Sequence, residues 1–129
     1  MITPSSVLTF WFDELAPEQL FKRDDAVDAQ IAHRFGKLHS ELACAVPPDW
    51  AATPRSLLAA VIVLDQFSRN LFRGDARAFV QDSTALALAE HAISHGWDTA
   101  LSLREKQFLY MPLMHSEVLG DVKRCISLM

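Results

Sequence analysis

Five charged or amide side chains occur within nine residues, directly after the most apolar segment of the chain. The segment reads LLAAVIVLDQFSRNLFRG, and its charged or amide members are Asp65, Gln66, Arg69, Asn70 and Arg73. An arginine guanidinium binds a planar carboxylate or phosphate through paired hydrogen bonds. Asp65 and Arg69 also have the i, i+4 spacing of a helical ion pair. The pattern is therefore typical of either an anion site or a buried polar network that joins helix ends.

On an α-helix these five side chains project into one sector that is about 140° wide. The same sector carries Leu58 and Ile62 in the preceding turns, so this face changes from apolar to polar without changing direction. We therefore expect the cluster to point toward other protein or into a cleft rather than into bulk water. A structural brace is the simpler of the two interpretations, and an anion site is the functional one.

His115 lies close to the apolar stripe of the last predicted helix, which places an ionisable ring on its core-facing side. A core histidine with one backbone or carboxylate partner is the simpler interpretation. The alternative is a general base, because partial burial and a neighbouring carboxylate tune a histidine into the working pH range. Glu117 projects away from His115 on the same helix. Asp65 is therefore the better candidate for that carboxylate.

His91 and His95 lie one helical turn apart, where both could contact one metal ion. The pair lacks a third ligand and the H-E-x-x-H pattern, and a solvated helix end that the helix dipole favours is the simpler interpretation. The sequence contains no glycine-rich phosphate loop, G-x-S-x-G elbow or C-x-x-C pair. We therefore predict neither a metal nor a cofactor.

The composition predicts one compact domain over residues 1–129. Half of the 129 residues are apolar, 22% are charged, and the formal net charge is −4. We expect no nucleic-acid partner because no overall positive field exists. We expect no membrane span because no apolar run approaches the roughly 20 residues that a span requires. The two distant cysteines and the lack of a basic leader favour a reduced, cytoplasmic protein.

Capping residues and prolines divide the chain into helices. Helix starts are predicted at Thr3, at Asp24 or Asp25, at Thr53, at Asp82 or Ser83, and at Ser102. The second and third helices should span about 25–43 and about 54–72, and a later one should end at Gly96. Pro112 falls inside the last helical pattern and predicts a kink or a break there. No segment alternates with period two, so we predict an all-α fold.

A set of longer motifs covers almost the whole chain: VLTFWF, LFKRDDAVDAQIAHRF, LDQFSRNLFRGDARAF, and FLYMPLMHSE followed by LGD. Their order and spacing resemble those of a bacterial family known as domain of unknown function 924. The resemblance implies a compact tetratricopeptide-like array of about five to seven helices, and no established reaction. The polar positions that match the family motifs are Asp65, Gln66, Arg69, Asn70, Arg73, Asp82, His115, Ser116 and Glu117.

The chain departs from this family at its end. Similar proteins continue with a motif of the type F-G-R-F-P-H-R-N, whereas this sequence ends at CISLM. If that segment helps to form a cleft with LDQFSRNLFRG, this chain carries half of a site. The apolar Ile126, Leu128 and Met129 would then lack a cover, and a partner or a second copy commonly buries such a patch. We therefore expect self-association.

From the sequence we predict a binding or interaction module in which Asp65, Arg69 and Arg73 organise a groove. Its ligand would be a protein or a small anion. Further candidate ligand-binding residues are Gln66, Asn70, Asp82 and Glu117. The less favoured alternative is a hydrolase or other acid-base enzyme that acts on an anionic metabolite, with His115 as the base and Asp65 orienting it.

Overall fold

The computed structural model describes residues 2–116 of the chain. Every regular element in this part is a helix, which confirms the predicted all-α fold. The α-helices are α1 (Pro4–Leu8), α2 (Asp25–Cys44), α3 (Pro54–Val61), α4 (Ser68–Leu71), α5 (Asp82–Ser94) and α6 (Leu103–His115). The π-helices are η1 (Thr9–Glu14) and η4 (Ile62–Phe67). The 3-10 helices are η2 (Pro17–Leu20), η3 (Pro48–Ala51), η5 (Ala76–Phe79) and η6 (Trp97–Ala100).

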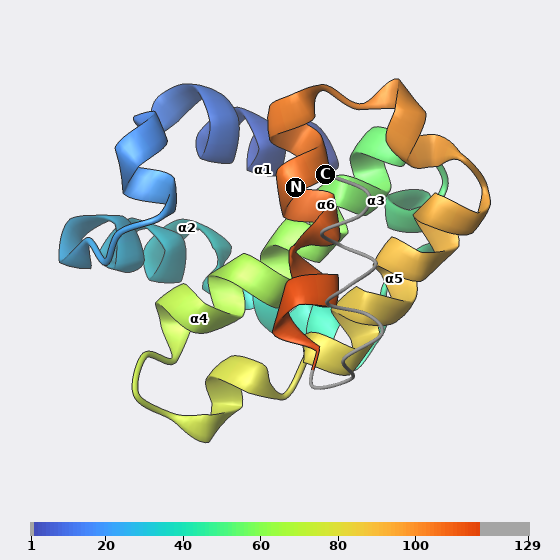
Figure 1. Ribbon diagram of the computed structural model, residues 1–129. Helices are drawn as coiled ribbons and strands as arrows, with labels where there is room; N and C mark the ends of the chain where they lie inside the picture. The colour runs from blue at the N-terminus through green and yellow to red at the C-terminus, as the bar shows by residue number, and fades with distance from the viewer. Residues whose placement is uncertain (1, 117–129) are drawn as a thin grey trace.

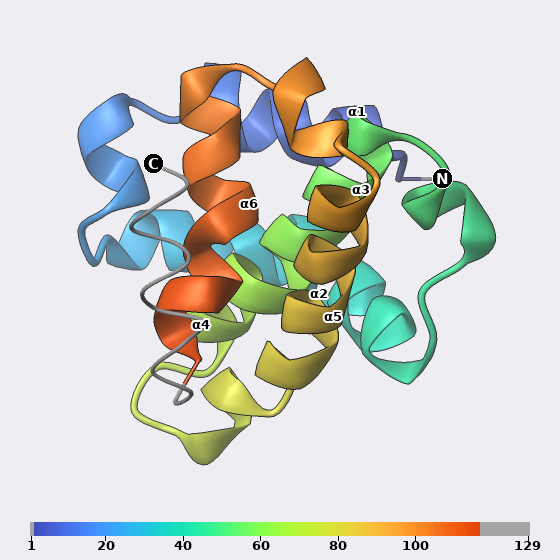
Figure 2. The same cartoon turned by 45° about the vertical axis from the view of Figure 1, so that its right-hand side comes forward.

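Residues 54–71 form one continuous helical run of α3, η4 and α4, which we call the central helix. Its segment from Leu57 to Leu64 is completely buried, as expected for a helix that is apolar nearly all round. Helices α1, α5 and α6 pack against α3, and α2 packs against α4. Figure 1 shows the central helix passing behind α6, and Figure 2 shows α5 and α6 side by side across it.

Most of the predicted helix ends are present. The side chains of Thr3, Asp24, Thr53 and Ser102 each accept a hydrogen bond from a backbone N–H in the first helical turn. Gly96 follows α5 with a φ of 70°, a left-handed conformation that glycine adopts at little cost. Among the described residues, no helix combines the length and the hydropathy needed to cross a bilayer.

One predicted helix start is wrong, and of the kink or break predicted at Pro112 the break is absent. The position before α5 is occupied by Gln81, which makes no capping bond, and Asp82 is the first residue of the helix. The Asp82 carboxylate is turned instead toward Arg69, which donates two hydrogen bonds to it. Helix α6 also continues through Pro112 without a break. Pro112 is buried three residues before the helix ends, so core packing offsets the missing hydrogen bond.

Candidate functional site

Asp65 is a fully buried carboxylate at the centre of the site. Three side chains donate hydrogen bonds to it: His115 Nδ1 at 2.7 Å, Arg69 Nη1 at 3.2 Å and Gln66 Nε2 at 2.8 Å. The predicted contact between Asp65 and His115 is therefore present, and it joins η4 to the end of α6. A buried carboxylate is stable only when such donors satisfy it, so these three donors account for its position.

Arg69 bridges two aspartates. Its Nη1 and Nη2 atoms donate to the two carboxylate oxygens of Asp82 at 3.0 and 3.1 Å, while Nη1 also contacts Asp65. The guanidinium lies 5.3 Å from the centre of the Phe79 ring. Two carboxylates thus balance its positive charge. Arg69 is therefore a link between the central helix and α5 more than a free anchor for an anion.

Asn70 and Arg73 belong to a second network, centred on Asp28 of α2. Asn70 Nδ2 donates to Asp28 Oδ1 at 2.8 Å, and Arg73 Nε donates to Asp28 Oδ2 at 2.5 Å. The single polar sector predicted from the sequence therefore faces two neighbours, α6 on one edge and α2 on the other. Asp28 was not predicted as a site residue, because an acidic residue in a first helical turn is explained by the dipole alone.

Two cavities lie beside these networks, and Arg69 and His115 line both of them. The smaller one, which we call the basic cavity, has a volume of about 230 Å³. It is lined by Trp11, Gln19, Leu20, Phe21, Lys22, Arg23, Gln66, Arg69, Asn70, Arg73, Met111 and His115. The larger cavity has a volume of about 630 Å³. It is lined by Arg69, Phe79, Val80, Asp82, Ser83, Leu86, Pro112, His115 and Ser116.

The lining of the basic cavity is rich in positive charge. Among residues 2–116, it contains four lysine or arginine side chains and His115, and no carboxylate. Arg73 is paired with Asp28, and Arg23 is paired with Asp25. Lys22 has no ion pair among residues 2–116. Within the described part of the chain, the basic cavity therefore has one lysine whose positive charge is not paired.

Trp11 also lines the basic cavity, and it carries a buried donor. Its ring is buried edge-on against Phe67 and Phe108, at centroid distances of 5.8 and 5.5 Å. Its Nε1–H is buried and has no hydrogen-bond partner within the described part of the chain. Buried donors are normally satisfied, so this Nε1–H is an exception within residues 2–116. Trp11 lies in η1 and Gln66 in η4, and π-helical turns are frequent at functional sites.

Sequence reasoning located part of this arrangement. Of the predicted residues, Gln66, Arg69, Asn70, Arg73 and His115 line the basic cavity, Asp82 lines the larger one, and Asp65 lies behind them. Glu117 lies outside the described residues. Trp11 and Lys22 were missed, although both fall within the family motifs quoted above. Nothing in their spacing connects them to LDQFSRNLFRG, because the connection exists only in the folded chain.

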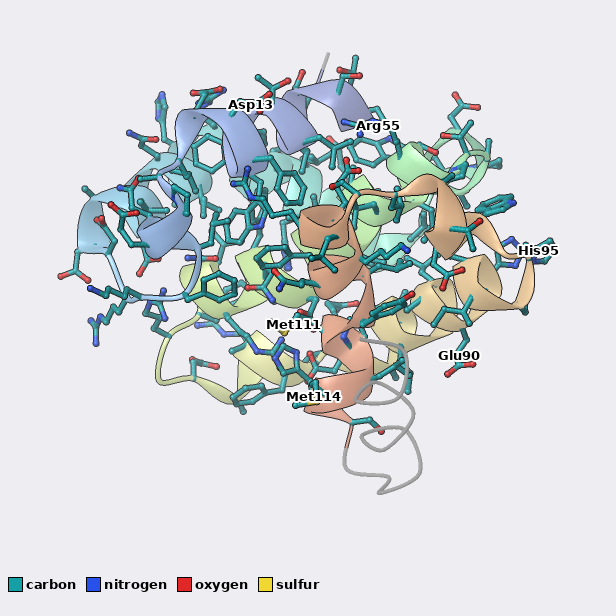
Figure 3. All side chains as sticks on the ribbon, turned by 45° about the horizontal axis from the view of Figure 1, so that its top comes forward. Asp13, Arg55, Glu90, His95, Met111 and Met114 are labelled. Carbon is teal, nitrogen blue, oxygen red and sulfur yellow. The ribbon has the colours of Figure 1, made fainter. Side chains whose placement is uncertain are left out.

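His91 of α5 and His95, which directly follows α5, lie away from the basic cavity. The rings of His91 and His95 are exposed and 4.2 Å apart. Figure 3 shows His95 at the edge of the molecule, far from Met111, which lines the basic cavity. Within residues 2–116, no three histidine, cysteine or acidic side chains are grouped closely enough to hold a metal ion.

Comparison with known proteins establishes the family. The solved structure of a protein of unknown function, ATU0120 from Agrobacterium tumefaciens, shares 33% sequence identity and superposes with a TM-score of 0.91. The match covers 97% of this chain and 70% of that chain. No curated protein matches this sequence. The family model for bacterial proteins of unknown function, DUF924, matches residues 7–129, and the chain therefore belongs to the DUF924 family.

Proposed function

We propose that this protein is a binding module for a small anionic ligand, which binds in the basic cavity. The observation that carries the proposal is the described lining itself, in which residues 2–116 supply five side chains able to bear positive charge and no carboxylate. The volume of about 230 Å³ is below the range of roughly 300–1,000 Å³ typical of drug-sized ligands. We therefore expect a small metabolite with a carboxylate or phosphate group.

Three groups would contact the anion. Lys22 supplies a charge that no described acidic residue balances. Arg73 uses Nε and Nη2 to hold Asp28, which leaves its Nη1 without a partner among the described residues. Trp11 supplies the unpartnered Nε1–H. Carboxylate and phosphate oxygens accept from all of these donors, and charged partners make such hydrogen bonds short and strong.

The wider proposal is that the protein is an interaction module of tetratricopeptide-like type that self-associates. Its support is an apolar surface beside the larger cavity, where Phe79 and Val80 are 59% and 62% exposed. Exposed apolar patches are commonly buried by a partner or by a second copy. A second copy would cover these two side chains.

Lys22→Gln provides the test of anion binding. We expect succinate, citrate or inorganic phosphate to raise the melting temperature more than chloride does at equal ionic strength. A ligand at about 100 times its dissociation constant stabilises by about 2.7 kcal/mol. Lys22→Gln should weaken binding about tenfold, because it removes a charge-assisted hydrogen bond worth about 1.5–3 kcal/mol.

Lys37→Gln is the matched control, because Lys37 is an exposed lysine of α2 that does not line the basic cavity. It should bind the anion like the unchanged protein. Arg69 is a poorer choice for substitution, since its loss would remove one of the three donors to Asp65 and the side-chain donors to Asp82. Equal binding by the two lysine variants, or no anion-specific stabilisation, would contradict the proposal.

A further inference from the structure

The hydrogen bond from His115 to Asp65 fixes which ring nitrogen carries the proton. Because the Asp65 carboxylate accepts from Nδ1, the neutral imidazole has its hydrogen on Nδ1 and a lone pair on Nε2. Within residues 2–116, Nε2 has no hydrogen-bond partner. Asp65 is in turn held by Arg69 and Gln66. His115 therefore presents an unpartnered basic nitrogen from a ring whose orientation is fixed.

His115 lies where two unlike environments meet. Its side chain is 25% exposed and lines both the basic cavity and the larger cavity. Phe79, Val80 and Leu86 give the larger cavity an apolar wall. A molecule with an anionic end and an apolar end would fill both cavities, and the bond between its two halves would lie at His115. The charged groups around this position are Asp65 and Arg69 of the central helix, Asp82 of α5, and Lys22, Arg23 and Arg73 across the basic cavity.

We propose that the site hydrolyses an ester that joins an anionic group to an apolar group, with His115 as the general base. The inference rests on the proposed binding of the anionic end in the basic cavity. In such a reaction His115 acts as the base and Asp65 orients its ring, while water, and no side chain, is the nucleophile. His115 would be the catalytic residue, and Asp65 the positioning residue that maintains its tautomer.

The step uses water as its second reactant. Nε2 of His115 takes a proton from a water molecule as the water oxygen forms a bond to the ester carbonyl carbon. The electron pair of the carbonyl π bond moves onto the carbonyl oxygen and then returns, which breaks the bond to the alkoxy oxygen. The leaving oxygen takes the proton from Nε2. The products are one carboxylic acid and one alcohol, and His115 regains its starting state.

Mono-4-nitrophenyl succinate is a suitable probe, because it carries a carboxylate at one end and an aromatic ring at the other. We expect the protein to hydrolyse it with a higher kcat/KM than 4-nitrophenyl butyrate, which lacks the carboxylate. His115→Gln should lower kcat at least about 100-fold, the size of a general-base contribution. His33→Gln, which changes an exposed histidine of α2, should leave kcat unchanged. Lys22→Gln should raise KM with kcat unchanged, as loss of uniform binding does.

Two further measurements on the unchanged protein keep the test independent of how the variants fold. The midpoint of the pH dependence of kcat/KM should match the ionisation of His115 followed by NMR, and different midpoints would overturn the inference. Succinate binding separates the two proposals. Succinate binding without hydrolysis, or with hydrolysis that His115→Gln retains, overturns the catalytic role alone. Absence of both succinate binding and hydrolysis overturns both proposals.

Discussion

His39 is a second buried histidine, and its surroundings differ from those of His115. Its Nε2 lies 2.7 Å from Ser68 Oγ, and Ser68 Oγ donates to the backbone oxygen of Leu64 at 2.6 Å. Since the hydroxyl has one hydrogen, it accepts from Nε2–H of His39. Within residues 2–116 the ring has no carboxylate as a hydrogen-bond partner, and burial lowers the pKa of His39. His39 is thus a structural histidine, whereas His115 is held by a carboxylate beside a cavity.

His39 should make the protein less stable in mild acid. A histidine in the unfolded chain has a pKa near 6.5, and the folded pKa of His39 is lower, so the unfolded state binds more protons between the two values. The contribution of neutral, buried His39 to the free energy of unfolding is fully present above the pKa that His39 has in the unfolded chain. It is lost as the pH falls through the pKa that His39 has in the folded protein. His39→Gln should therefore flatten the dependence of the unfolding free energy on pH between about pH 7.5 and pH 5.

Urea denaturation at a series of pH values measures this dependence. His33→Gln serves as the control, because His33 is an exposed histidine on the same helix. A His39→Gln variant with the full pH dependence of the unchanged protein would show that His39 is not the group responsible.

The pairing of His115 with Asp65 could be predicted because each residue stands out in its own segment: a charged group at the end of an apolar run, and an ionisable ring near an apolar stripe. Lys22 and Trp11 could not be predicted in this way. Lys22 follows an ordinary surface pattern, and Trp11 is an expected core residue within VLTFWF. Within residues 2–116, Lys22 has no ion-pair partner and Trp11 Nε1 has no acceptor. A sequence pattern does not show that a partner is missing.

The helices themselves were largely predictable, because caps, prolines and apolar periodicity act over a few residues. The central helix was expected at about 54–72 and is found at 54–71. Its π-helical turn, η4, was not predictable. The choice between α and π hydrogen bonding there depends on how the buried side chains pack against several other helices, and not on local propensity.

The link between α2 and α4 should be worth more than a surface ion pair. Asp28→Ala leaves Asn70 and Arg73 without their shared acceptor, and the Asp28 side chain is only 16% exposed. We expect the free energy of unfolding to fall by about 1–2 kcal/mol, in the lower part of the range for partly buried groups left without a partner.

Asp25→Ala is the comparison, because Asp25 lies one turn earlier in α2 and forms a largely exposed pair with Arg23. Asp25→Ala should lower the free energy of unfolding by less than about 1 kcal/mol, because it removes only a favourable interaction with the helix dipole and a surface ion pair. Urea denaturation of both variants measures the difference. Equal losses would show that the Asp28 network does not join the two helices energetically.

For the molecule as a whole, the exposed apolar surface around the larger cavity predicts self-association. Light scattering should give a mass that is a multiple of the 14.5 kDa of one chain. Val80→Asp should shift the mass toward that of one chain, because a charge at a buried apolar contact is costly. Leu103→Asp should leave the mass unchanged. Leu103 is also exposed, at 70%, but it lies at the opposite end of α6 from the larger cavity. An unchanged mass in Val80→Asp, or a monomeric unchanged protein, would contradict this prediction.

The π-helical turn also bears on how the gene can change. A π turn encloses one residue more than an α turn, because its hydrogen bonds span five residues rather than four. Loss of one codon within η4 would convert the turn to α-helix, while the residues on either side keep their orientation. The same loss within α2 would rotate its later residues by about 100° and turn Leu38 or Leu42 away from the core. Loss of one residue should therefore disturb the core less within η4 than within α2.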